Sequence, residues 1–224
     1  MKGISEVRAL EKLKKIMSKN KIVTSLIGKG YYNCNLPSTI RRHVLENPKW
    51  YTPYTPYQAE ISQGRLETLY YFQKMIQEMT ELPFSNASML DQGSTSAEVI
   101  SMSKGYHRNK RSTYLASETL HPYILDILET KCDVQNINLK IGNLNDFSID
   151  SDTIGMMFQY PDTYGNICVP EKLIADANQN NSVVSCGTDL MALTKIKPPG
   201  ELGVDIAYGT AQRFGIPLYY GGPH

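Results

Sequence analysis

The fold class follows from one apolar run, Ile154-Gly155-Met156-Met157-Phe158. A strand without polar side chains suits a sheet that helices cover on both faces. Similar strands alternate with helical patterns along the rest of the chain. Strands are predicted at Thr113–Ala116, Val134–Leu139, Ile154–Tyr160, Val183–Cys186 and Val204–Tyr208, and helices at Thr95–Ser103, Pro122–Thr130 and Pro170–Gln179. The alternation predicts an α/β domain with a mostly parallel, doubly wound sheet, whose ligands gather beyond the carboxyl ends of the strands.

The first third of the chain is rich in loops and helical patterns. Apolar residues recur at helical spacing near the N-terminus, at Val7, Leu10, Leu13 and Met17. This spacing predicts an amphipathic surface helix. A short helix is expected after Pro37, and a well-buried helix of about four turns over Leu66–Met79. We therefore expect a helical and Pro/Tyr-rich arm over residues 1–85 and the sheet domain over residues 86–224.

Composition restricts the classes of partner. The chain has 23 basic and 22 acidic residues, which gives no electrostatic case for nucleic acid or an anionic membrane. No apolar run approaches the roughly 20 residues that span a bilayer. The four cysteines are scattered without metal-ligand spacing, as expected for thiols in a reducing compartment. No clear signal or transit peptide is recognised, so a cytoplasmic location is expected.

The most unusual segment is Trp50–Gln58, with the sequence WYTPYTPYQ. Its two prolines exclude a regular helix and favour an extended or turning path. Its four aromatic side chains offer rigid stacking faces with polar tips. The residues alone leave two readings equally open: an arm that wraps the domain or a partner subunit, or a wall over a flat ligand.

Three polar turns are candidate sites beside the sheet. Ser94-Thr95-Ser96 opens a helix where backbone amides could hold a phosphate, although the pattern by itself favours an ordinary N-cap at Ser94 or Thr95. Asp189 follows a buried strand and could pair with a cationic ring nitrogen, or cap the next turn. Arg213 follows the last strand and could face a phosphate or carboxylate, although a solvated arginine is more usual there.

Taken in order, the segments of this chain resemble the P-protein of the glycine cleavage system. The matching stretches are Gly30–Asn33, Trp50–Gln58, Glu60–Arg65, Asn86–Asp91, Phe158–Asp162, Pro198–Glu201, Gln212–Gly215 and Gly221–His224. Several motifs in one order are more specific than any single short motif. The resemblance implies the large domain of a fold-type I pyridoxal-phosphate (PLP) enzyme, present here as a partial domain.

The activity that the resemblance implies is glycine decarboxylation, with the aminomethyl group passed to a lipoyl carrier, the H-protein. The family has two related halves, in one chain or as two subunits, and these stretches belong to the first half. The lysine that binds PLP lies in the second half. The matching turn here carries Gln212, which has no amine to form an imine. The family also continues past His224, so the chain is expected to be a truncated homologue.

The same resemblance assigns provisional roles to the candidate residues. Ser94, Thr95 and Ser96 match the place of the PLP phosphate, and Asp189 matches the partner of the pyridinium nitrogen; all four would belong to a vestigial site. The Trp50–Gln58 segment would reach the PLP pocket of the other half. Residues expected to form that wall are Tyr51, Tyr54, Thr55, Tyr57, Gln58 and Ser62.

Three interpretations follow from the sequence. In the first, the chain takes part in glycine decarboxylation only with a second half or a homologous subunit that binds PLP. In the second, it is a catalytically silent binding or regulatory protein of the same system. In the third, it is an inactive, truncated relic. Lys195 and Lys197 precede the last strand and occupy the wrong turn to replace the missing lysine.

Overall fold

A computed structural model describes residues 3–52, 55–87 and 89–218. Two compact units divide the chain, Met1–Tyr31 and Tyr32–His224. The first contains helix α1, Glu6–Met17, with no buried side chain. This confirms the predicted surface helix. The acidic Glu6 in its first turn and the basic Lys14 and Lys15 in its last turn both complement the helix dipole.

The second unit opens with helices α2, Ser38–Leu45, and α3, Ala59–Thr80. The prediction that the α3 region is well buried is wrong: only Ser62 and Thr80 of α3 are buried. Within the predicted stretch, Leu66, Leu69, Phe72, Ile76 and Met79 are half-buried, and Tyr70 is exposed. Helical spacing identifies the apolar face of a helix and does not say what covers it. One covering contact comes from Phe214, whose ring meets that of Phe72 edge to face at 6.2 Å.

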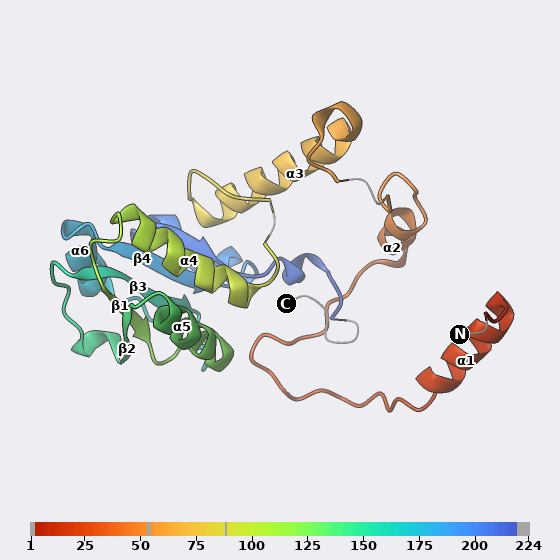
Figure 1. Cartoon of the computed structure of the whole chain (residues 1–224), viewed down its shortest axis with the longest axis horizontal. Helices are drawn as coiled ribbons and strands as arrows, with labels where there is room; N and C mark the ends of the chain where they lie inside the picture. Colours follow the sequence, from red (N-terminus) through yellow and green to blue (C-terminus); the bar gives the residue numbers. More distant parts are fainter. Residues whose placement is uncertain (1–2, 53–54, 88, 219–224) are drawn as a thin grey trace. The chain divides into compact units, whose positions relative to one another are not determined.

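The centre of the second unit is a five-stranded sheet in the order β2-β1-β3-β4-β5, and every pairing is parallel. Its strands are β1, Thr113–Ser117; β2, Asn138–Gly142; β3, Thr153–Tyr160; β4, Val183–Thr188; and β5, Ile206–Tyr208. The helices between them are α4, Gln92–Tyr106; α5, Pro122–Val134; and α6, Glu171–Gln179. Figure 1 shows α4 and α5 lying over the sheet. The predicted parallel α/β class is confirmed.

Two predicted strands need correction. The strand expected at Val134–Leu139 begins only at Asn138, because α5 continues to Val134 and Asn136 then turns the chain with a positive φ of 53°. The strand expected at Val204–Tyr208 begins at Ile206. In both cases an apolar residue next to a turn has the same pattern as the start of a strand.

The core has one apolar cluster on each face of the sheet. Alternate residues of β1 show the division: Tyr114 and Ala116 join the α4 and α5 side, while Leu115 joins the α6 side. The Tyr114 hydroxyl and the Ser185 hydroxyl share a 2.8 Å hydrogen bond inside this core. Burial raises the pKa of Tyr114 well above its ordinary value, so the side chain stays neutral.

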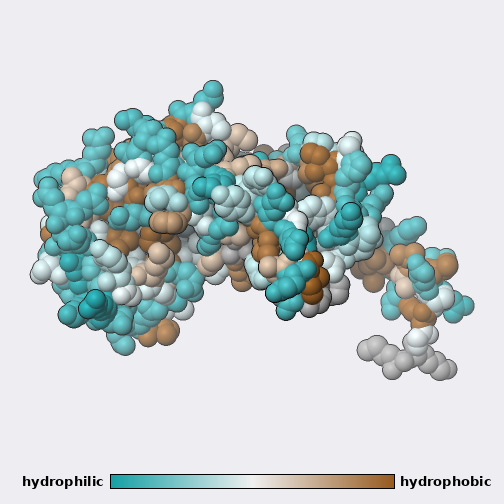
Figure 2. Space-filling view, turned by 90° about the horizontal axis from the view of Figure 1, so that it is seen from above, coloured by the Kyte–Doolittle hydropathy of each residue, from teal (hydrophilic) through white to brown (hydrophobic). Residues whose placement is uncertain are grey.

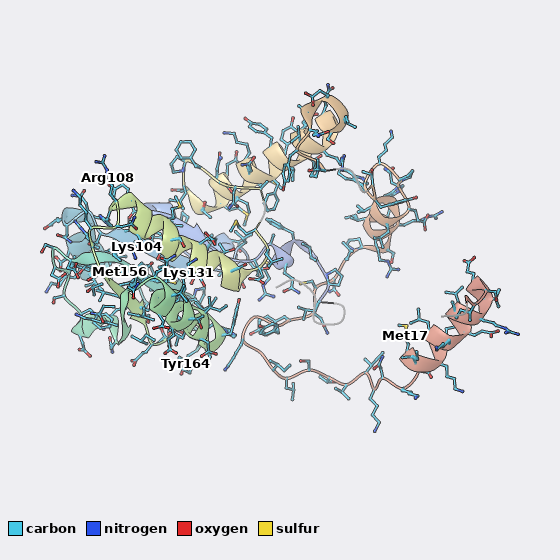
Figure 3. All side chains as sticks on the ribbon, viewed as in Figure 1. Met17, Lys104, Arg108, Lys131, Met156 and Tyr164 are labelled. Atoms are coloured by element: carbon cyan, nitrogen blue, oxygen red, sulfur yellow. The ribbon has the colours of Figure 1, made fainter. Side chains whose placement is uncertain are left out.

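Polar contacts join α4 to α5 along their outer surface. Lys131 on α5 lies 4.0 Å from the carboxylate of Glu98 on α4, and the Lys104 ammonium donates to the carbonyl of Gln135 (Figure 3). Gln135 in turn donates through its amide to the Ser101 hydroxyl. The two helices are therefore fixed to each other on one face of the sheet.

The surface carries apolar side chains among hydrophilic ones (Figure 2). Exposed apolar residues include Tyr51, Tyr57, Ile61, Tyr70 and Met75. Among the described residues, none of the helices has the length and apolarity needed to cross a bilayer.

Candidate functional site

The candidate site lies where β4 and β5 end. Asp189 directly follows β4, and the 3-10 turn Gln212–Phe214 follows β5 after a short loop. Loop Tyr32–Asn35 reaches the same edge, and with these turns it lines a pocket of about 630 Å³. Parallel strands bring their carboxyl ends to one edge, which explains why turns far apart in sequence meet here.

An ion pair spans the two turns. Arg213 Nε donates to Asp189 Oδ2 at 2.9 Å, with the arginine side chain 15% exposed and the aspartate side chain 35% exposed. The guanidinium carbon of Arg213 also lies 4.9 Å from the centre of the Tyr32 ring, within the range of a cation–π contact. The second oxygen of Asp189 accepts from the backbone N–H of Met191 at 2.9 Å. The structure thus brings together two predicted site residues, Asp189 and Arg213, and pairs them with each other.

Gln212 is buried beside this pair, at 2% exposure. Within the part of the chain that the structure describes, neither its amide nitrogen nor its amide oxygen has a hydrogen-bond partner. Its backbone carbonyl accepts from the Cys34 thiol at 3.2 Å. Gln212 is therefore a buried polar side chain for which the described residues supply no side-chain partner, and such groups are uncommon in protein interiors.

The start of α4 carries its own cap. The Asp91 carboxylate accepts from the Ser94 backbone N–H at 2.6 Å and from the Ser94 hydroxyl at 2.8 Å. The Thr95 and Ser96 hydroxyls donate to the backbone carbonyls of Asp91 and Gly93, both at 2.6 Å. The cap is therefore Asp91, where the sequence had suggested Ser94 or Thr95. Hydrogen bonds from Ser94 lower the pKa of Asp91, so the cap is charged near neutral pH.

Most of the residues predicted to form a wall over the partner's pocket are exposed to solvent. Tyr51 is 62% exposed and Tyr57 is 66% exposed; Thr55 and Gln58 are exposed as well. Ser62 is buried: its hydroxyl donates to the Thr55 carbonyl at 3.3 Å and accepts from Arg65 at 2.5 Å. Tyr54 lies outside the described residues. The arm therefore presents aromatic side chains outward, next to a buried serine that ties it to the start of α3.

Comparison with solved structures identifies the fold. An O-acetylhomoserine (thiol)-lyase from Campylobacter jejuni, described as putative and carrying a pyridoxyl-lysine, matches with a TM-score of 0.54 and 14% identity over 82% of this chain and 48% of the other. With the parallel sheet, this likeness shows that the chain has the α/β fold of the large domain of fold-type I enzymes, present as a partial domain.

Sequence comparison then gives the family. The model of the glycine cleavage system P-protein matches residues 1–224, and the chain belongs to that family. A mitochondrial glycine dehydrogenase (decarboxylating) from Pisum sativum is 47% identical over 99% of this chain. A solved structure of an inhibitor-bound glycine decarboxylase (P-protein) matches with a TM-score of 0.88 and 26% identity. The match covers 100% of this chain and 52% of the solved chain. The chain spans about a fifth of the pea relative's length, 21%.

The residues at the candidate site do not fit PLP. The amide of Gln212 cannot form an imine. Asp189 is already paired with a cation, and the amide and hydroxyl of Ser94 are already bonded to a carboxylate. Neither the ring nitrogen nor the phosphate of the cofactor would find a free partner in these groups. A role for Ser94, Thr95, Ser96 and Asp189 in binding a cofactor stays a prediction.

Sequence reasoning missed two residues that line the pocket, Tyr32 and Cys34, and it missed Asp91 as the cap of α4. Asp91 had a local signal, because an acid three residues before Ser94 is a common N-cap pattern. Tyr32 and Cys34 had none: they lie 181 and 178 residues before their partners Arg213 and Gln212, respectively. Only the folded chain brings them to the sheet edge.

Proposed function

We propose that this chain acts in glycine decarboxylation as the half of a P-protein that does not bind PLP. The observation that carries the proposal is Gln212, a buried amide at the turn that matches the imine-forming lysine. Membership of the family supports the reaction class. The lysine and the cofactor would then be supplied by a second half, in the same chain or as a homologous subunit.

No other lysine takes over the role of Gln212 in this proposal. Lys195 and Lys197 are both exposed and lie between β4 and β5. Both precede β5, whereas Gln212 stands in the turn that follows β5. PLP chemistry is therefore assigned to the partner half.

The Trp50–Gln58 arm is proposed to complete the pocket of that partner. Tyr51 and Tyr57 offer aromatic faces and hydroxyl groups on an exposed, proline-stiffened segment. Such side chains could shape a site for glycine or for the lipoyl arm of the H-protein. Ser62 and Arg65 would hold the base of the arm in place.

The test is reconstitution with a lysine-bearing P-protein half and H-protein. Exchange of carbon dioxide with the glycine carboxyl group should require both halves, and Tyr57→Ala should lower it about tenfold or more. Tyr106→Ala is the matched control, because Tyr106 is equally exposed, at 66%, but lies at the end of α4. Binding of the partner half without any exchange would contradict the proposal and favour a regulatory protein. No binding would favour an inactive relic.

A further inference from the structure

Each charge that PLP would bring to this site is already present as a side chain of the protein. A cofactor needs a carboxylate for its cationic ring nitrogen and a helix N-terminus for its anionic phosphate. Here the carboxylate, Asp189, is already paired with Arg213. The helix N-terminus, at the start of α4, is already bonded to the carboxylate of Asp91.

The cationic position belongs to Arg213. Its guanidinium pairs with Asp189 and stacks on Tyr32, and the side chain is 15% exposed. A ring nitrogen could reach Asp189 only if this guanidinium lost its carboxylate while still largely shielded from water. Breaking one partner of a shielded pair is unfavourable because it leaves the other charge uncompensated.

The anionic position belongs to Asp91. Its carboxylate takes the backbone N–H and the hydroxyl of Ser94, and the Thr95 and Ser96 hydroxyls bond to carbonyls of the same turn. A phosphate at this helix start would have to displace a carboxylate and would be repelled by it. Figure 1 shows the start of α4 on the side of the sheet where β4 and β5 end.

We propose that Arg213 and Asp91 are internal substitutes for the ring nitrogen and the phosphate of PLP, and that they close this site to the cofactor. Loss of the lysine is then only one of three changes that exclude PLP. The inference concerns what the site binds, so it stands or falls separately from the proposed part in glycine decarboxylation.

The experiment restores the lysine in two backgrounds of the whole chain. Gln212→Lys alone, and Gln212→Lys combined with Arg213→Ala and Asp91→Asn, are incubated with PLP, reduced with borohydride and analysed by mass spectrometry. Asparagine keeps the helix cap but removes its charge. The triple variant should carry about tenfold or more pyridoxyl adduct on the introduced lysine than the single variant. Gln212→Lys combined with Asp91→Asn alone, which keeps the Arg213 cation, should lower that yield again.

Two results would overturn the inference. Gln212→Lys alone could take up PLP as fully as the triple variant, which would make the lost lysine a sufficient explanation. A folded triple variant could also give no adduct. If circular dichroism shows that the triple variant does not fold, the pair Arg213→Ala and Asp91→Asn is tested for PLP retained on dialysis. Retention above the unsubstituted chain would support the inference, and equal retention would overturn it.

Discussion

At the scale of single residues, the site is governed by which charges already have partners. Asp91 stabilises the start of α4 through two hydrogen bonds from Ser94, and Asp189 is neutralised by Arg213. Of these two acids, Asp189 is the one that the sequence predicts as a ligand-binding residue, because it follows a buried strand. Their present partners make them structural in this chain, because a carboxylate that has its hydrogen bonds offers little to a ligand.

The Asp91 cap should contribute measurably to stability. Asp91→Ala is expected to lower the free energy of unfolding by about 1 kcal/mol, while Asp91→Asn should lower it less. The folded-state pKa of Asp91 is depressed, so its contribution is present above the ordinary carboxyl pKa and is lost as pH falls through the folded-state value. Chemical denaturation of the three proteins across acidic pH is the measurement. A gap between the unsubstituted chain and Asp91→Asn that does not narrow with acid would contradict the assignment.

At the scale of elements, the strands of the sheet are tightly packed, whereas helix α3 is only partly buried. The buried strands β1, β3 and β4 carry the two halves of the core, whereas α3 is only partly covered. The space around two glycines, one in β3 and one in α3, shows this difference in packing. At Gly155 in β3, an added Cβ would collide with the backbone carbonyl of Val183, but at Gly64 in α3 it would meet no atom within 4 Å.

Alanine at these two glycines should therefore act in opposite directions. Gly155→Ala is expected to cost about 3 kcal/mol or to prevent folding, because the carbonyl of a central strand cannot move aside. Gly64→Ala should stabilise the chain by roughly 0.5–1 kcal/mol, since alanine favours a helix interior. Thermal and chemical unfolding of both variants would decide the matter. A neutral Gly155→Ala would show that β3 and β4 are less closely packed than described.

At the scale of the whole molecule, the chain consists of two separate units. The described part of Met1–Tyr31 has no buried side chain, whereas Tyr32–His224 contains both apolar clusters of the core. Apolar burial is the main source of folding free energy. The stability of the fold should thus reside in the second unit.

Removing residues 1–31 should leave the unfolding midpoint of the remainder within about 2 °C. A deletion of residues 1–35 is the matched comparison, because it also removes Tyr32 from Arg213 and Cys34 from the Gln212 carbonyl. That longer deletion should lower the midpoint clearly. Calorimetry of the three proteins makes the comparison. Equal losses from both deletions would mean that the first unit contributes to the core.

The sequence by itself determined the parallel α/β class, the surface helix α1 and the family, because apolar periodicity and ordered motifs are local properties of the chain. The resemblance to the family also predicted that Gln212 stands at the turn that matches the PLP lysine. Only the tertiary structure decided that Arg213 pairs with Asp189, that Tyr32 lies under the guanidinium, and that α3 is half-covered. Those facts depend on turns that meet at one sheet edge from distant parts of the chain, and periodicity carries no information about such long-range contacts.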